Sequence, residues 1–294
     1  MNKQLGQVFT KKIVADFMVE LFNIRKDAQL LDPCFGEGVF IKSALNHGFK
    51  NIDGYEIDKE LFRSLINEGY SGTNLYNCDF LKSTSNKKYD GVIMNPPYIR
   101  HEEIDDLIIY DISKEKLRED IIFKELPKTA NLYMYFVIKA FDMLKENGEM
   151  IIIFPSTWLT TEGGEYFKRL LFNNYSVVGQ YEVFGEPFHR DALVEVSILH
   201  VKKTLSTANN IIDKKILNIY DRCIEEYKTQ DIKLNFDISF NSYAKIRRGL
   251  TTGFNKLYIN PEGVSQEFLK PIVSSPKDIT GYSTDNAILD YVLM

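Results

Sequence analysis

The sequence predicts a Rossmann-like α/β fold with a mostly parallel, seven-stranded sheet, and three observations support this. Short apolar strands are expected at residues 29–31, 52–55, 75–78 and 91–94. Helical segments around 38–45 and 59–66 separate the first three strands, and such alternation is typical of parallel sheets covered on both faces. Glycine-rich or polar residues directly follow each strand, where open α/β sheets bind ligands.

The remaining elements follow in order along the chain. An amphipathic helix is expected from Ile13 to Phe22, with Thr10 as its N-cap. The polar segment 101–128 interrupts the pattern and is expected to be a mobile insertion above the sheet. Beyond it we expect helices at 132–145 and 165–172, a strand at 150–154, and two further strands, 176–183 and 193–201, that could pair as a hairpin.

A change in composition after residue 203 predicts two domains, 1–203 and 211–294, joined by the polar linker 204–210. We expect a charged helix over 211–227 at the start of the second domain. The net charge of −5 argues mildly against a nucleic-acid partner but does not exclude one, because DNA binding requires only a local basic surface. Candidates for such a surface include Arg247 and Arg248.

The cellular location is expected to be cytoplasmic. No apolar stretch approaches the roughly 20 residues of a membrane span, and the polar N-terminus lacks the apolar run of a signal peptide. The three cysteines, Cys34, Cys78 and Cys223, are widely spaced and are expected to be free thiols in a reducing compartment. The four histidines show no metal-ligand spacing, so no catalytic metal is expected.

The strongest motif is the sequence Asn95-Pro96-Pro97-Tyr98, directly after a predicted strand. An aryl amine is a weak nucleophile because its lone pair delocalises into the ring. The side-chain amide oxygen of Asn95 and the backbone carbonyl of Pro96 could each accept one amino proton and so localise the lone pair for attack. Tyr98 offers a flat face for a base held outside a duplex.

Three further motifs also follow strands. Asp32 precedes a loop that contains Gly36 and Gly38, which would let a ligand approach the backbone. Glu56 lies about 20 residues later, the spacing of a carboxylate that binds ribose hydroxyls. Asp79 could accept a hydrogen bond from an adenine amino group while Phe80 packs on the ring. Each carboxylate alone is about as well explained as a helix N-cap or a surface charge, but four such features in this order favour a site.

Together these residues resemble the TaqI-type adenine-N6 DNA methyltransferases of restriction-modification systems. The resemblance implies a fold that binds S-adenosylmethionine, with Thr10 on the methionine carboxylate and Phe136 lining the adenine pocket beside Asp32, Gly36, Gly38, Glu56, Asp79 and Phe80. It implies Asn95, Pro96 and Tyr98 as catalytic residues. It also implies that Phe184 is a second aromatic against the flipped adenine, with Phe188 and His189 as weaker alternatives. Segment 152–159 matches a family segment expected to be structural.

The resemblance further implies double-stranded DNA as partner, with residues 247–253 and 270–273 beginning a target-recognition domain. That domain is usually longer in the family, so either the chain is a fragment or a separate specificity or recognition polypeptide supplies the rest. Alternatives remain open: a protein glutamine-N5 or RNA amino-group methyltransferase, or a non-catalytic DNA-specificity module. Cytosine-N4 methylation also uses a similar loop, but more often with Ser at the position of Asn95. Cys34 is expected to pack or to line the pocket, because it lies in the Gly loop rather than after the catalytic strand.

Overall fold

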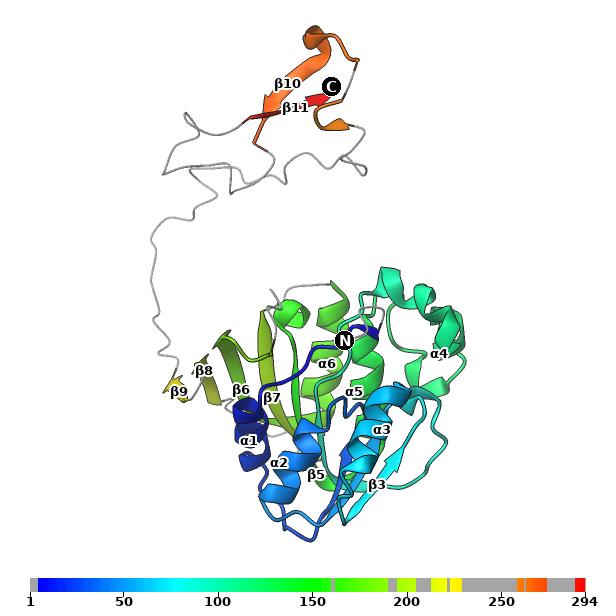
Figure 1. Cartoon of the computed structure of the whole chain (residues 1–294), viewed down its shortest axis with the longest axis vertical. Coiled ribbons are helices and arrows are strands. Elements are labelled where there is room, and N and C mark those ends of the chain that lie inside the picture. Colours follow the sequence, from blue (N-terminus) through cyan, green and yellow to red (C-terminus); the bar gives the residue numbers. More distant parts are fainter. Residues whose placement is uncertain are drawn as a thin grey trace. The chain divides into compact units, whose positions relative to one another are not determined.

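The computed structural model describes residues 5–159, 162–189, 195–204, 213–220, 223–228, 258–261, 263–273 and 289–293. The chain divides into two compact units, Met1–Asp231 and Ile232–Met294. The first unit holds a large sheet with helices on both faces (Figure 1). Most of the expected linker 204–210 lies outside the described residues.

The sheet of the first unit has nine strands in the order β3-β2-β1-β4-β5-β7-β6-β8-β9. Strands β1 to β5 pair in parallel, and so do β6 and β8. Strand β7 runs antiparallel to its neighbours β5 and β6, and β9 runs antiparallel to β8. The strands are β1 (Gln29–Asp32), β2 (Asn51–Tyr55), β3 (Thr73–Tyr76), β4 (Tyr89–Met94), β5 (Leu144–Pro155), β6 (Tyr175–Gly185), β7 (Val196–Lys203), β8 (Asp213–Ile219) and β9 (Ile224–Lys228).

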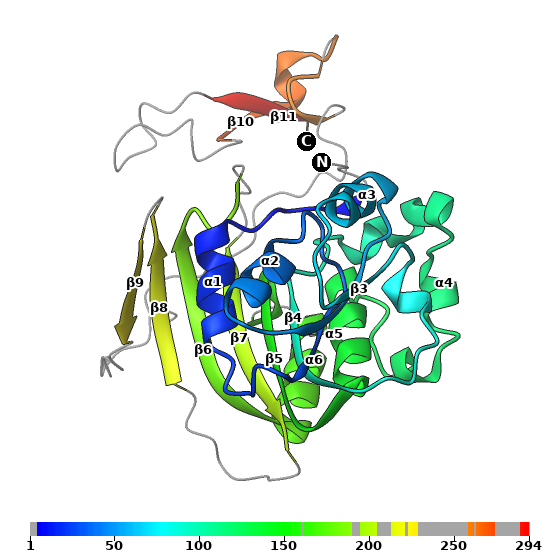
Figure 2. The same cartoon turned by 60° about the horizontal axis from the view of Figure 1, so that its bottom comes forward.

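The α/β class, the mostly parallel sheet and the β6–β7 hairpin are confirmed, but the count of seven strands is wrong. The additional strands are β8 and β9, which occupy the segment where a charged helix was expected and lie at one end of the sheet in Figure 2. Lysine and glutamate residues suggested a solvated helix there. The alternation that decides the structure is short: Leu217 and Ile219 are buried, while Asn218 between them points away from the core.

Two layers of helices cover the sheet. Helices α1 (Lys12–Glu20), α2 (Val39–Asn46) and α3 (Lys59–Asn67) contribute to a core on one face. Helices α5 (Leu132–Asp142) and α6 (Glu162–Asn174) contribute to a second core on the other face. Because both faces are covered, the central strands are apolar throughout, and residues 150–154 of β5 are fully buried.

The segment 101–128 is packed against the protein rather than forming a mobile insertion. It folds into η3 (His101–Tyr110), α4 (Lys114–Leu117) and η4 (Ile121–Phe123). Its apolar residues, spaced irregularly between charged ones, belong to the core that contains α5; they are Ile104, Leu107, Ile112, Leu117, Phe123 and Leu126. Because these side chains are scattered among charges, sequence periodicity did not reveal their burial.

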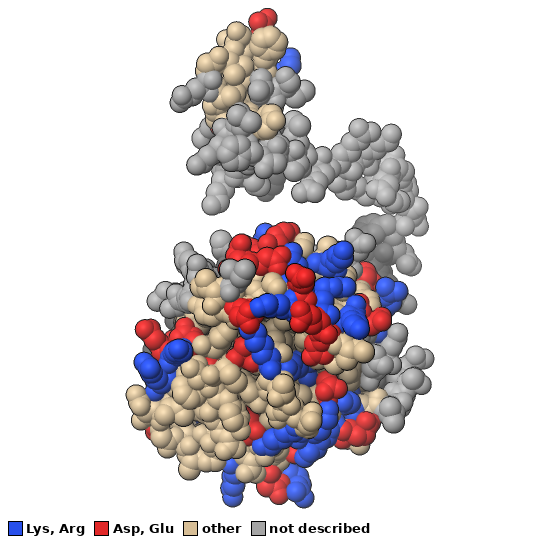
Figure 3. All heavy atoms as spheres, turned by 90° about the vertical axis from the view of Figure 1, so that its right-hand side faces the viewer, with Lys and Arg blue, Asp and Glu red and all other residues tan. Residues whose placement is uncertain are grey.

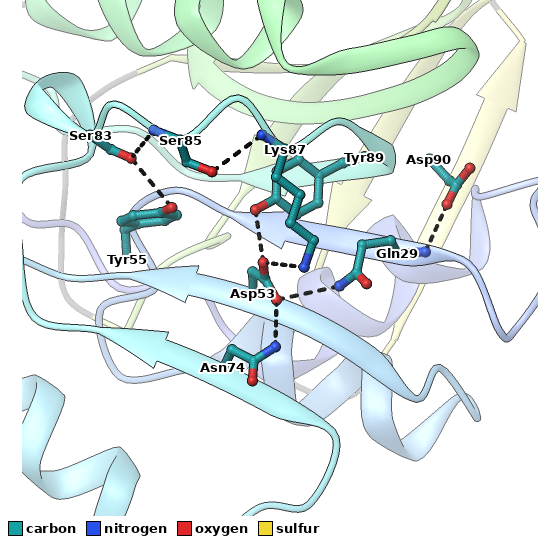
Figure 4. A network of polar contacts seen from close by, with 9 residues as sticks. All are labelled: Gln29, Asp53, Tyr55, Asn74, Ser83, Ser85, Lys87, Tyr89 and Asp90. Carbon is teal, nitrogen blue, oxygen red and sulfur yellow. Dashed lines mark hydrogen bonds and ion pairs between the residues drawn. The ribbon is translucent and has the colours of Figure 1, made fainter.

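A polar network links the parallel strands on the face of the sheet that α5 covers (Figure 4). The buried carboxylate of Asp53 in β2 accepts hydrogen bonds from the Tyr89 hydroxyl at 2.8 Å and from Lys87 Nζ at 2.6 Å. Its other oxygen accepts from Asn74 Nδ2 at 2.9 Å and Gln29 Nε2 at 3.3 Å. Asp53 therefore joins strands β1, β2, β3 and β4 through side chains as well as through the backbone ladder.

The second unit contains a two-stranded antiparallel sheet of β10 (Leu269–Ile272) and β11 (Asp290–Leu293). The short helix η7 (Gln266–Phe268) precedes β10. Asn260 ties a neighbouring turn to β11, donating to Asp290 Oδ1 and accepting from the Tyr291 amide, each at 2.7 Å.

Candidate active site

The topology brings the four sequence motifs to one edge of the sheet. Strands β3, β2, β1 and β4 are adjacent and parallel, so their carboxyl ends lie side by side. Asp79 follows β3, Glu56 follows β2, the Gly loop follows β1 and Asn95 follows β4. The chain order reverses between β1 and β4, which is the switch point at which open α/β sheets bind ligands.

A cavity of about 890 Å³, measured to its open mouth, lies at this edge. Most of the residues predicted to hold the cofactor line it, together with the predicted catalytic asparagine; these are Thr10, Gly36, Glu56, Asp79, Phe80, Phe136 and Asn95. Asp32, Gly38, Pro96, Tyr98 and Phe184 are not among the lining residues. The cavity therefore unites motifs that are separated by up to 126 positions in sequence.

Glu56 is fixed by backbone amides on both of its carboxylate oxygens. Oε2 accepts from the Gly36 amide and Oε1 from the Asp58 amide, each at 2.8 Å. Burial raises the pKa of this carboxyl, and the two amide hydrogen bonds oppose that rise. Each oxygen keeps a further lone pair, so the clamped carboxylate can still accept hydroxyl protons from a bound ribose.

Asp79 presents an acceptor without a partner. Its Oδ1 caps the short helix η2 (Phe80–Lys82) by accepting from the Leu81 amide at 2.9 Å. Its buried Oδ2 has no hydrogen-bond partner in the described part of the chain, and burial raises the pKa of the carboxyl. Phe80 and Phe136 stack with ring centroids 5.8 Å apart on the same wall. An unsatisfied acceptor beside apolar rings fits an adenine with its exocyclic amino group.

Asp32 and Gly38 do not line the cavity, although the resemblance implies that both lie at the cofactor. Asp32 is fully buried behind the Gly loop, where Oδ1 accepts from the Cys34 amide at 3.3 Å and Oδ2 has no partner among the described residues. Gly38 precedes α2 with φ +76°, and a Cβ there would meet Leu65 at 2.5 Å. Its glycine is explained by helix packing and backbone conformation, whereas Gly36 (φ +55°) lines the cavity.

Asn95 is held in one orientation. Its Nδ2 donates to the Val8 carbonyl at 2.7 Å and to the Thr10 hydroxyl at 3.0 Å. A carbonyl can only accept, so this pair of contacts identifies which atom of the amide is nitrogen. The remaining atom, Oδ1, is buried and has no hydrogen-bond partner among the described residues. An aligned, unsatisfied acceptor at the cavity is the arrangement that an amino-group substrate requires.

Thr10 was expected to cap the first helix, and this expectation is wrong. The N-cap of α1 is Lys11, and no side-chain cap is formed. The Thr10 hydroxyl instead accepts from Asn95, while its backbone forms a bridge to Phe188. Thr10 remains on the cavity wall, where the resemblance placed it.

The aromatic residues expected at the target base differ in exposure. The Tyr98 hydroxyl donates to the Ile153 carbonyl at 3.3 Å, and its ring meets the edge of Phe188 at a centroid distance of 6.1 Å. Phe188 is only 4% exposed, so it supports Tyr98 rather than offering a free face. Phe184, which was expected to stack on the base, is 52% exposed near the end of β6. Val183 beside it pairs with Val196, which in turn pairs with Pro155 at the end of β5.

Cys34, in the Gly loop, contacts the loop that follows β4. Its thiol donates to the backbone carbonyl of Asn95 at 3.3 Å. Burial raises the pKa of the thiol well above its usual value, and the neighbouring carboxyls of Asp32 and Glu56 raise it further. A protonated thiol is a poor nucleophile, so this cysteine lines the pocket without being activated.

Sequence reasoning missed several apolar residues of the cavity wall. Ile57 directly follows Glu56, so its position beside a predicted site residue was a usable signal. Leu107 and Ile112 come from the segment that was expected to be mobile. No sequence signal placed these two at the cavity, because only packing brings η3 over this edge.

Arg247 and Arg248 fall outside the described residues. In the part of the chain that the structure describes, no three His, Cys, Asp or Glu side chains are grouped closely enough to hold a metal ion. Within the same residues, no helix is long and apolar enough to cross a membrane. Segment 152–159 is structural where it is described: Ile152, Ile153, Phe154 and Trp158 are fully buried.

The nine-stranded sheet and the cavity at its switch point define a class I S-adenosylmethionine-dependent methyltransferase fold, whose cofactor is S-adenosylmethionine. A Listeria monocytogenes protein described as a class I methyltransferase of this kind superposes with a TM-score of 0.54 at 15% identity, covering 72% of this chain and 65% of its own. The methyltransferase subunit of a type I restriction-modification system from Streptococcus thermophilus gives 0.56 at 20% identity, covering 72% and 47%.

The particular family follows from sequence. Residues 20–186 match the Eco57I restriction-modification methylase family, and the chain belongs to it. The type II methyltransferase M.HincII of Haemophilus influenzae is 31% identical over 78% of this chain and 42% of its own length. M.AccI of Acinetobacter calcoaceticus is 26% identical over 94% of this chain and 58% of its own length. The chain therefore spans about half the length of these curated relatives. The expected resemblance to restriction-modification methyltransferases is confirmed.

Proposed function

We propose that the chain is the catalytic part of a site-specific DNA methyltransferase that methylates the N6 amino group of an adenine flipped out of double-stranded DNA. The observation that carries this proposal is the buried Oδ1 of Asn95, a residue of the cavity wall: it has no hydrogen-bond partner among the described residues, while two hydrogen bonds fix the nitrogen of the same amide. Membership of the Eco57I family supports DNA as substrate and the modification arm of a restriction-modification system as the setting.

The residues of the cavity fit S-adenosylmethionine. Glu56 would accept from the ribose hydroxyls, and Asp79 Oδ2 would accept from the adenine amino group beside Phe80. The bound cofactor supplies an activated methyl group with its own leaving group. The chain therefore has to orient the target nitrogen rather than to activate the donor.

Asn95 and Pro96 act on the target nitrogen. Asn95 Oδ1 and the Pro96 carbonyl each accept a hydrogen bond from the amino group, so the nitrogen lone pair delocalises less into the ring and can point toward the methyl group. As the nitrogen gains positive charge, both acceptors interact with it more strongly. The proline ring fixes φ, and Pro96 is buried, so its carbonyl is held rigidly.

Tyr98 and Phe184 are the proposed stacking surfaces for the flipped base. Phe184 has the exposed ring that such a role requires, whereas the ring of Phe188 is covered. We keep Phe184 as the stacking residue and assign Phe188 to the support of Tyr98.

We expect most contacts with the DNA backbone to be made by parts of the protein other than the face shown in Figure 3. On that face, basic and acidic side chains are interspersed over the first unit rather than separated into a basic surface. The net charge of −5 agrees with such a mixture. Recognition of a target sequence is therefore assigned to the second unit together with a longer recognition domain or a separate specificity polypeptide.

The test is methyl transfer from isotopically labelled S-adenosylmethionine to duplex DNA, RNA and protein, with mass spectrometry of the digested products. We expect labelled N6-methyladenine from duplex DNA with the wild type and almost none with Asn95→Ala. N4-methylcytosine would change the assigned base. Label in RNA or on glutamine would replace DNA as substrate, and cofactor binding without any transfer would indicate a non-catalytic module.

A further inference from the structure

The N-terminal segment 6–11 runs directly against the catalytic loop. The Tyr98 amide donates to the Gly6 carbonyl at 3.2 Å, and Asn95 donates to Val8 and Thr10. On the other side, the backbone amide of His189 donates to the Phe9 carbonyl at 3.0 Å, and the backbone amide of Lys11 donates to the Pro187 carbonyl at 2.9 Å. The segment thus connects the loop after β4 with the loop between β6 and β7.

The contact to Asn95 is buried and directional. The Thr10 side chain is almost fully buried, so its hydroxyl is not readily replaced by water. The Thr10 oxygen accepts from Asn95 Nδ2, which leaves its single hydrogen for another acceptor. Without the Thr10 hydroxyl, one amide hydrogen of Asn95 would lose its acceptor, and the Val8 carbonyl would hold the amide through a single hydrogen bond.

We propose that Thr10 is a positioning residue for catalysis: its hydroxyl, together with the Val8 carbonyl, restricts the side-chain rotation of Asn95 so that Oδ1 can face the amino group of the target base. This inference rests on the proposed function. It differs from the contact with the cofactor carboxylate that the resemblance implies for Thr10, because it acts through Asn95 and concerns the rate of transfer rather than cofactor binding.

The test compares Thr10→Val with Thr10→Ser. Valine keeps the shape but removes the hydroxyl, and serine restores it. At saturating cofactor, where any loss of cofactor affinity no longer matters, we expect Thr10→Val to lower the single-turnover rate by about 10-fold, the effect of losing one hydrogen bond. Thr10→Ser should stay near the wild-type rate. Thr73→Val is the matched control, because Thr73 donates to the Tyr70 carbonyl at 2.9 Å and lies outside the cavity lining.

A double-mutant cycle shows whether Thr10 acts through Asn95. If it does, adding Thr10→Val to Asn95→Ala lowers the rate no further. Equal losses in the wild-type and the Asn95→Ala backgrounds would overturn the proposal, as would a Thr10→Val rate like that of wild type.

A second readout does not depend on methyl transfer. The side-chain amide resonance of Asn95, assigned by its disappearance in Asn95→Ala, should move in NMR spectra of Thr10→Val and remain in place in Thr73→Val. An unmoved resonance in Thr10→Val would show that Thr10 makes no hydrogen bond to Asn95, and this would overturn the proposal. If the wild type transfers no methyl group while the resonance moves as expected, the proposed function fails and the positioning contact stands.

Discussion

The thiol of Cys34 donates a hydrogen bond to the backbone carbonyl of Asn95 across 3.3 Å, joining the loop after β1 to the loop after β4. Since burial and nearby carboxyls raise the pKa of this thiol, we predict that it takes no covalent part in the reaction. Cys34→Ala should retain methyl transfer within about 10-fold of wild type, the loss expected for one hydrogen bond. A covalent enzyme–DNA adduct in mass spectra that disappears in Cys34→Ala would contradict this prediction.

Replacing Asn95 by Ala should slow the single-turnover rate by roughly 100-fold or more, because one of two acceptors aligned on the target nitrogen is removed. Cofactor affinity, measured by calorimetry, should change little. Near-normal rates in this variant would rule out the proposed mechanism.

Tyr98→Ala should weaken capture of the flipped base by about 1–3 kcal/mol of stacking, while Tyr98→Phe should be mild. Phe184→Ala should show a loss similar to that of Tyr98→Ala in binding of duplexes that carry a fluorescent base at the target position. Phe188→Leu serves as the comparison. If Phe188→Leu weakens base capture and Phe184→Ala does not, the stacking role belongs to the buried ring.

Cofactor affinity should fall in mildly acidic solution. Burial raises the pKa of Glu56 in the free protein, and binding of ribose hydroxyls favours the ionised form. Binding therefore releases a proton at pH values below the raised pKa of the free protein, and affinity increases as the pH rises toward that pKa. Calorimetry from pH 5 to 8 should show this dependence in wild type. Asp79, whose pKa burial also raises, adds dependence of the same sign.

The control for that experiment is Glu56→Gln, which cannot titrate. Its affinity should be lower at neutral pH by about 1–3 kcal/mol and less dependent on pH. Equal pH dependence in both proteins would assign the titration to another group.

Asp53→Ala should lower the free energy of unfolding by about 2–4 kcal/mol, because the Tyr89 hydroxyl and the amides of Asn74 and Gln29 lose their shared acceptor. Asp27→Ala removes an exposed ion pair with Arg25 and should cost below about 1 kcal/mol. Urea denaturation of both variants is the measurement. Similar losses would mean that the Asp53 network of Figure 4 contributes little.

By itself the sequence determined the α/β class, the positions of the first four strands along the chain and the motifs after them. Alternating apolar strands and helices imply parallel pairing, and parallel strands bring their carboxyl ends to one edge. The positions of Glu56, Asp79 and Asn95 at one edge of the sheet could therefore be predicted, because each of these residues directly follows a strand. The stretch from 101 to 128 could not be predicted, since its buried residues follow no period.

Only the tertiary structure decided what each of these side chains contacts. The segment 211–227, expected to be a helix, contributes to two strands instead, because Leu217 and Ile219 are buried once β8 pairs with β6. The tertiary structure also assigned Gly38 to packing against Leu65, separated the exposed Phe184 from the buried Phe188, and placed Thr10 against Asn95. The physical reason is that hydrogen bonds and burial between residues 85 positions apart depend on how the strands meet, which local sequence does not specify.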